Sequence, residues 1–215
     1  MEIDLPRAPI HSVKDFFIHI FTITVGILIA LGLEQSLEAY HHLQLANEAR
    51  ANIVSELRDN KHNLDAVRGK IPKLIEEPES VLKIVNQALA HSLQKTPKMG
   101  LHFNLVTTTS TSWTTAQAVG ALSYMNYQEV KGFSEAYQLQ QRFEDVQKAA
   151  FEATISAIST VGEPKAGMEK WSNQDLDNAK QQLQRCLAAD QVYRQFAGAL
   201  SQEYAEVLSK HITSK

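Results

Sequence analysis

The chain has 215 residues, of which 44% are hydrophobic and 21% are charged, a composition typical of a folded protein and not of a disordered or collagen-like one. Its length allows one folded domain with a short appendage. The 21 basic and 24 acidic residues give a formal net charge of -3, which offers no basic face, so we expect no nucleic-acid partner. Only 9 glycines and 6 prolines occur, and such rare helix breakers favour long helices.

The N-terminal region contains an uncharged apolar run, FFIHIFTITVGILIALGL, at 16–33. With Val13 and Lys14 it reaches about 20 residues, the length that crosses a hydrocarbon core of ~30 Å at 1.5 Å per residue. We therefore predict a transmembrane helix at 16–33, after an N-terminal tail at 1–15 and before an external helical stalk and bundle at 34–215. No second run of this kind follows, so the predicted protein is single-pass in the lipid bilayer.

Two alternatives stay open for this segment. The first is a buried helix of a soluble core. The second is a cleaved signal peptide of an exported helical protein, because Lys14 would close a charged region and Ala30-Leu31-Gly32 offers small residues to a signal peptidase. Against cleavage, the helical pattern continues without a break from the apolar run into residues 34–67.

Basic residues predict the orientation of the span. Arg7 and Lys14 precede it, whereas the 17 residues that follow contain Arg50 as their basic residue together with three glutamates. The positive-inside rule therefore places the N-terminus in the cytoplasm and residues 34–215 outside it, by a margin of one basic residue.

Two features of the apolar run concern its neighbours in a membrane. Gly26 and Ala30 form a small-xxx-small pair, a spacing that lets two helices approach closely, and we predict helix–helix association there. His19 is the ionisable side chain of the run. It lies about one turn from the N-terminal interface, so we expect it to reach the headgroups or water.

The apolar stripe continues beyond the span and predicts a stalk helix that ends at Gly69 and Pro72. Pro78 is expected to open a short helix over 79–94. Residues 95–112 have no helical period and predict a loop, after which Ser112 would cap the helix that carries Trp113.

Two long helices complete the predicted fold. Asn126-x-x-Glu129 has the form of a capping box before a long helix that Gly162-Glu163-Pro164 stops. Ser172 and Asp175 indicate the start of a final helix of about forty residues without proline. We find no alternating strand pattern of useful length. The sequence therefore predicts an all-α protein in which an N-terminal transmembrane helix continues into a stalk and is followed by an antiparallel helical bundle.

Polar residues interrupt the apolar stripes of both long helices. Asp190 lies between Leu187 and Tyr193, and Gln140 lies between Tyr137 and Phe143. A local twist that exposes these side chains is the simpler interpretation. The alternative is a buried polar residue that fixes the register of the bundle.

Residue patterns that carry chemistry are missing. The 8 histidines form neither an HExxH motif nor a His-x3-His pair, and Asp59-x-x-His62 is a single copy that cannot build a two-metal site. Cys186 is the one cysteine, which we interpret as a small buried residue, with an intermolecular disulfide as the alternative. There is no GxSxG elbow and no phosphate-binding glycine loop. We expect no catalytic residue, no metal site and no cofactor, and hence no enzyme.

Two blocks of sequence resemble a known group of proteins. The first is GILIALGLEQSLEAYHHLQLANEARANIVSELRDNKHNLDAV at 26–67, and the second joins Trp113-Thr-Thr-Ala116 to Gly120-Ala-Leu122 and Tyr137. Both are similar to segments of an uncharacterised family of small bacterial single-pass membrane proteins with an external helical domain. The resemblance implies a bacterial inner-membrane protein whose helical domain is periplasmic, and it implies no activity or ligand.

The expected function is therefore that of a non-enzymatic, membrane-anchored helical module that binds or positions another protein of the envelope, or that forms a homo-oligomer. The alternative is a membrane-tethered domain that binds a small molecule and acts through a partner. Its pocket would lie among four aromatic residues: Trp113, Tyr124, Tyr127 and Trp171.

Overall fold

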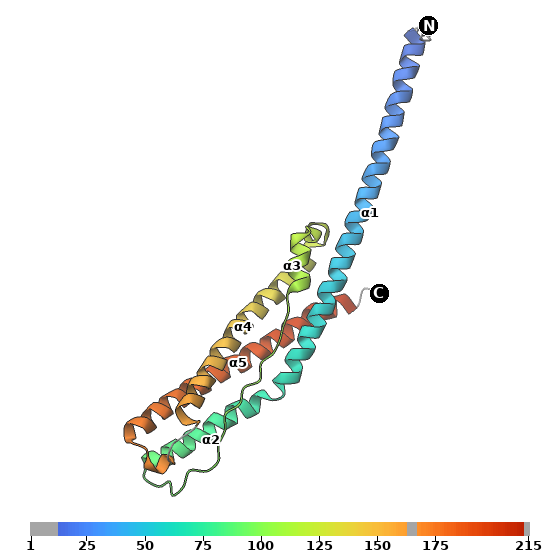
Figure 1. The fold of residues 1–215 in the computed structure, drawn as a ribbon. Helices are drawn as coiled ribbons and strands as arrows, with labels where there is room; N and C mark the ends of the chain where they lie inside the picture. Colours follow the sequence, from blue (N-terminus) through green and yellow to red (C-terminus); the bar gives the residue numbers. More distant parts are fainter. Residues whose placement is uncertain (1–12, 163–166, 213–215) are drawn as a thin grey trace, which may run out of the picture. The chain divides into compact units, whose positions relative to one another are not determined.

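The computed structural model describes residues 13–162 and 167–212, and helices hold 84% of them. The described residues contain no strand. The helices, drawn in Figure 1, are α1 (Val13–Arg68), α2 (Ile71–Leu89), α3 (Thr111–Ala118), η1 (Ala121–Tyr124), α4 (Tyr127–Val161), η2 (Met168–Lys170) and α5 (Asn173–Ile212). The predicted all-α class is confirmed, with a long apolar N-terminal helix followed by helices that pack together.

The chain divides into two compact units, which we call unit 1 (residues 1–48) and unit 2 (residues 49–215). In unit 1, the apolar part of α1 contains an 18-residue window with a mean hydropathy of 2.4, none of which is buried. Thr22 and Thr24 each donate their hydroxyl to a carbonyl one turn earlier, at 2.8 Å, so these side chains bring no unpaired donor to the helix surface. The helix is long and apolar enough to cross a membrane, a property that a signal sequence shares.

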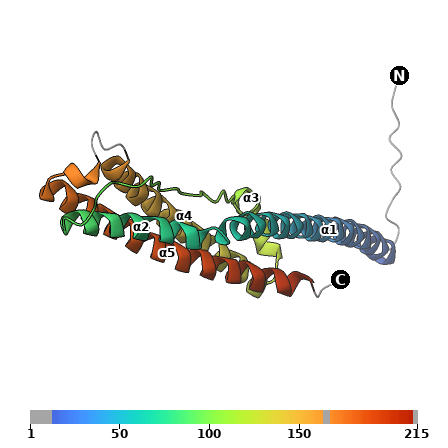
Figure 2. The same cartoon turned by 90° about the horizontal axis from the view of Figure 1, so that it is seen from below.

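Unit 2 is an antiparallel arrangement of long helices. As the numbering of α4 rises, that of its partners on α5 falls: Gln140 bonds Tyr204, Gln147 bonds Tyr193, and Thr154 lies 3.6 Å from Cys186. Helix α2 packs along α5 as well, and the three helices lie side by side in both Figure 1 and Figure 2. The apolar stripes thus cover one another, as helices of a bundle do.

The connection between α2 and α3 crosses the length of the bundle without helix. We call residues 95–110 the extended segment, the thin green trace in Figures 1 and 2. An extended chain rises ~3.3 Å per residue and a helix 1.5 Å, so these residues span roughly the 50 Å that the 35 residues of α4 span. The predicted loop is confirmed, and its extension explains how so few residues return the chain to the other end.

Helix α1 ends at Arg68, just before Gly69, as predicted for the stalk, but the boundaries predicted for the next helix, α2, are wrong. The helix runs from Ile71 to Leu89, with Pro72 in its first turn and Pro78 inside it. Pro72 is tolerated because first-turn N–H groups have no helical acceptor, whereas Pro78 forgoes one internal hydrogen bond but is buried. Two residues past the end of the helix, His91 has a φ of 54°, and the amide of Ser92 donates to the carbonyl of Gln87 at 2.9 Å. This is a Schellman ending without the glycine that usually signals it.

Three helix starts were predicted from capping residues. Asn126 caps α4 by accepting a hydrogen bond from the amide of Gln128, which confirms the helix start, but the carboxylate of Glu129 binds Arg50 instead of completing the predicted capping box. The start of α3 is wrong, because Ser110 is the N-cap and the amide of Ser112 donates to the carboxylate of Glu56. At the end of α4, Gly162 follows the last helical residue, while Glu163 and Pro164 lie outside the described residues.

Replacing Ser172 by alanine should lower the unfolding free energy by about 1 kcal/mol, because the Ser172 hydroxyl accepts a hydrogen bond from the amide of Asp175 at the start of α5. Ser159→Ala is the matched control, since that hydroxyl donates to the carbonyl of Ser156 within α4 and caps no amide. Thermal unfolding of both variants, followed by circular dichroism, measures the difference. Equal stability of the two variants would contradict the cap.

Candidate functional site

The buried face of α4 carries polar side chains at an interval of seven residues. Gln140, Gln147 and Thr154 are 3%, 8% and 2% exposed, respectively. An interval of seven keeps residues on one face of a helix, so the three side chains form a polar line through the core of unit 2. The expectation that Gln140 is exposed is therefore wrong, and the alternative of a buried polar residue holds.

Two side-chain amides pair with the backbone of the extended segment as a neighbouring strand would. The amide of Gln147 accepts from the N–H of Val106 at 2.7 Å and donates to the carbonyl of the same residue at 3.0 Å. Asn60 of α1 makes the same pair with Thr109, at 2.9 Å and 2.7 Å. Buried backbone groups need hydrogen-bond partners, and these amides supply them in place of a β-sheet.

Gln140 of α4 connects Asn60 of α1 with the extended segment. Its Nε2 donates to the carbonyl of Thr109 at 3.2 Å, and its Oε1 accepts from Asn60 and from the hydroxyl of Tyr204. Seven helical residues rise about 10.5 Å, and three extended residues rise about 10 Å. The spacing from Gln140 to Gln147 therefore matches the spacing from Thr109 to Val106.

Glu56 forms a second polar cluster where the extended segment meets α3. Its carboxylate accepts from the hydroxyl of Tyr137 at 2.5 Å and from the amide of Ser112 at 3.0 Å. Burial, reinforced by the bond to Glu56, holds the pKa of Tyr137 above its usual range. Trp113 stacks on Tyr137 with ring centroids 5.4 Å apart. Both rings line a groove of about 380 Å³.

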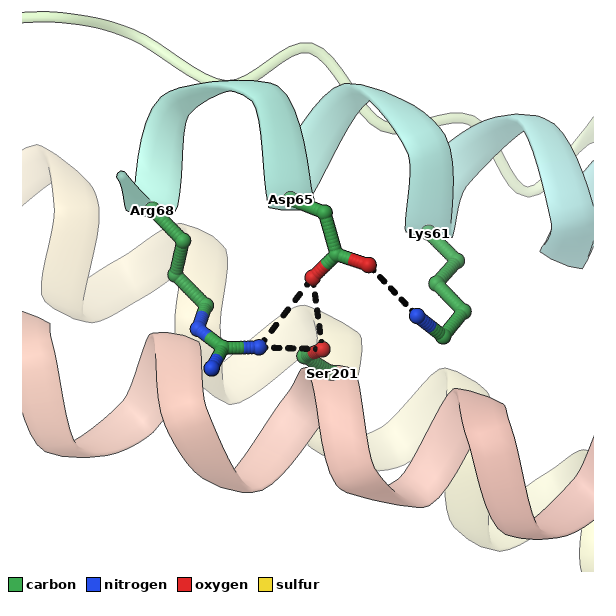
Figure 3. A network of polar contacts seen from close by, with 4 residues as sticks. All are labelled: Lys61, Asp65, Arg68 and Ser201. Carbon is green, nitrogen blue, oxygen red and sulfur yellow. Dashed lines mark hydrogen bonds and ion pairs between the residues drawn. The ribbon is translucent and has the colours of Figure 1, made fainter. Parts of the chain in front are cut away.

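A third cluster, shown in Figure 3, fastens the end of α1 to α5. Asp65 accepts from Lys61, from Arg68 at 3.1 Å and from the hydroxyl of Ser201 at 2.7 Å. Arg68 also donates to Ser201 at 2.6 Å. Burial acts to raise the pKa of Asp65, but these bonds and the two positive charges outweigh it and hold the pKa below its usual value. The carboxylate is thus fully engaged in joining the two helices.

A fourth cluster lies at the end of unit 2 where α4 begins. The guanidinium of Arg50 binds the carboxylate of Glu129 through two nitrogens, and Nδ1 of His211 lies 3.5 Å from the same carboxylate. The hydrogen bond from Arg50 to Glu129 raises the pKa of Arg50. His211 also stacks on Phe133, with ring centroids 5.0 Å apart. The cluster ties α1, α4 and α5 together.

Asp190 is a buried acid of the core and lies beside the cysteine. It is 2% exposed, so its predicted exposure is wrong. One carboxyl oxygen lies 3.5 Å from Sγ of Cys186, and the other has no hydrogen-bond partner in the described part of the chain. Burial raises the pKa of Asp190 to about 6 and that of the Cys186 thiol to about 12. Cys186 is 1% exposed, so its interpretation as a small buried residue is confirmed.

The four aromatic residues of the predicted pocket do not come together. Trp113 lies in the groove beside Tyr137, and Trp171 packs against the core cluster of α2 and α5 that contains Val81 and Leu176. Tyr124 and Tyr127 are 46% and 75% exposed. The groove lined by Trp113 contains none of the other three. Gly26 and Ala30 are exposed on α1, and a Cβ atom built on Gly26 meets no other atom within 4 Å.

Comparison of the chain with protein-family models, curated proteins and solved structures finds no match. Within the described ranges, no group of three or more histidine, cysteine, aspartate or glutamate residues is placed to hold a metal ion.

The polar residues described above thus hold the helices of unit 2 together. Gln147 and Asn60 were not singled out from the sequence. One pattern points to part of the network, namely the polar residues at 140, 147 and 154 within an apolar stripe, but it does not name their partners in the extended segment.

Proposed function

We propose that this protein is a non-enzymatic helical module, anchored in the bacterial inner membrane by residues 16–33, that positions another protein of the envelope. The apolar helix of unit 1, attached to a compact helical unit 2, carries this proposal. A helix without a polar face is stable in lipid and unstable in water. The N-terminus is then cytoplasmic, and unit 2 lies in the periplasm, as Arg7 and Lys14 predict.

The polar chemistry of unit 2 supports an interaction module over a catalyst. Glu56, Asp65 and Glu129 are each held by two or more bonds within the unit. By contrast, exposed apolar side chains gather within nine residues at the corner between α3 and α4: Val119, Tyr124 and Tyr127. Exposed aromatic residues are favoured contacts between proteins, so this corner is the first surface to test.

Mild-detergent extraction of the full chain with a C-terminal tag tests the proposal. We expect an envelope protein to co-purify in a fixed ratio and the double variant Val119→Ser, Tyr127→Ser to reduce its recovery several-fold. Val192→Ser is the matched control, because Val192 is an exposed apolar residue elsewhere, on α5. Intact mass should show the complete N-terminus. A mass lacking about 30 residues would favour the exported soluble protein, and the absence of any co-purifying protein would contradict the module.

A second candidate function is the binding of a small molecule by a membrane-tethered domain that acts through a partner. The groove of about 380 Å³ beside Trp113 and Tyr137 favours it, since it combines two stacked rings with the exposed side-chain amides of Gln117 and Gln141. A metabolite that raises the melting temperature of the wild-type chain, but not that of Trp113→Leu, would support this candidate.

A further inference from the structure

Apolar residues on one face of unit 1 continue beyond the apolar run. Leu33, Leu37 and Tyr40 are 68%, 59% and 63% exposed, and the last two lie past the end of the run. Their spacing of four and three residues continues the spacing that leads from Gly26 to Ala30 and on to Leu33. Positions separated alternately by four and three residues form one seam of a helix, the a and d positions of a heptad repeat.

Three further observations concern this seam. His19, the ionisable residue of the apolar run, falls on it about one turn from the N-terminal interface. Gly26 also falls on it, and no neighbouring atom of the chain requires a glycine there, as is also true of Gly32 off the seam. The pattern extends from Phe16 to Tyr40, about three and a half heptads, and the next two seam positions, Gln44 and Asn47, are polar.

We propose that this seam is the interface of a parallel homodimer, in which α1 of one copy packs along α1 of a second copy from within the membrane to about residue 40. The same apolar run anchors both copies at the same depth, so a parallel pair is in register. Each seam position then meets its own counterpart: leucine meets leucine, and Gly26 and Ala30 let the backbones approach.

The charged residues of α1 are compatible with a second copy of the helix at this seam. Glu34 and Glu48 lie beside the seam at e positions, where a parallel partner presents the residue five positions earlier, Ile29 or Leu43. Glu38 lies at a b position, away from the seam. No like charges are therefore opposed between two copies of residues 16–48. The inference rests on the proposed function only in requiring that residues 16–33 are held in a membrane.

Single cysteines introduced into the full chain, in native membranes, test the seam. The wild-type chain is the background, because Cys186 is buried. Under oxidation with copper phenanthroline, Leu37→Cys and Tyr40→Cys should form disulfide-linked dimers several-fold more than Gln35→Cys and Ala39→Cys, which occupy the f and c positions of the same helix. Leu33→Cys, also on the seam, should form disulfide-linked dimers to the same extent as Leu37→Cys and Tyr40→Cys.

Equal cross-linking at all positions, or none at Leu37 and Tyr40, would overturn the dimer, as would cross-links to a protein of another size. A second measurement is the mass of the detergent-extracted chain by light scattering. It should be that of two copies for the wild type and of one copy for Gly26→Ile with Leu37→Asp, with an unchanged melting temperature of unit 2. A monomeric wild type that still co-purifies with an envelope protein would refute the dimer and leave the proposed function standing.

Discussion

Replacing Gln147 by leucine should lower the unfolding free energy by about 2 to 4 kcal/mol. The leucine keeps most of the side-chain volume but leaves the buried N–H and carbonyl of Val106 without their partner. It also removes an acceptor, at 3.4 Å, of the hydroxyl of Tyr193. Each buried polar group left unpaired costs roughly 1 to 3 kcal/mol, which exceeds what the added apolar surface returns.

Gln138→Leu is the matched control, because Gln138 is exposed on the same helix and donates to the hydroxyl of Ser134. Its unfolding free energy should change by less than about 0.5 kcal/mol. Chemical unfolding of the detergent-solubilised chain, followed by circular dichroism, gives both values. Hydrogen exchange should also become faster at the amide of Val106 in Gln147→Leu. Equal stability of the two variants would show that the amide pairing contributes nothing.

The second large effect concerns Asp190 and depends on pH. Burial raises the pKa of this carboxyl from 3.8 to about 6, so between these values the folded state keeps a proton that the unfolded state releases. The unfolded state then binds fewer protons, and the contribution of Asp190 to stability falls as pH rises through this window. The contribution is complete below about pH 4 and is lost above about pH 6.

Asp190→Asn should therefore match the wild type near pH 4 and exceed its stability at pH 7 by about 3 kcal/mol, at 1.36 kcal/mol per pH unit. Asparagine has the shape of the protonated acid and carries no charge at any pH. The lowered pKa of Asp65 acts in the opposite direction, but it is common to both chains and cancels in the difference. Unfolding curves at pH 4, 5, 6 and 7 measure the gap, and a gap that does not change with pH would contradict a buried neutral Asp190.

The amino-acid sequence by itself determined the helices and the candidate span. Asn126 and Ser172 mark the starts of α4 and α5, and the uncharged run at 16–33 marks the apolar part of α1. These features depend on residues within a turn or two of one another, so a short window of sequence contains them. The end of α2 was misplaced for a related reason. The residue with a left-handed backbone conformation after this helix is His91, and a histidine in a sequence does not indicate that conformation as a glycine does.

Only the tertiary structure decided whether the polar residues within the apolar stripes are buried or exposed. A sequence pattern gives the same expectation for Gln140, Gln147 and Asp190 as for an exposed residue, because burial depends on what covers the helix. The residue that covers Gln147 is Val106, which is 41 residues away in the chain. Val106 lies in the extended segment, whose sequence has no helical period. An extended segment can lie against a bundle only if side chains bond its backbone, and those bonds exist only once the helices are packed.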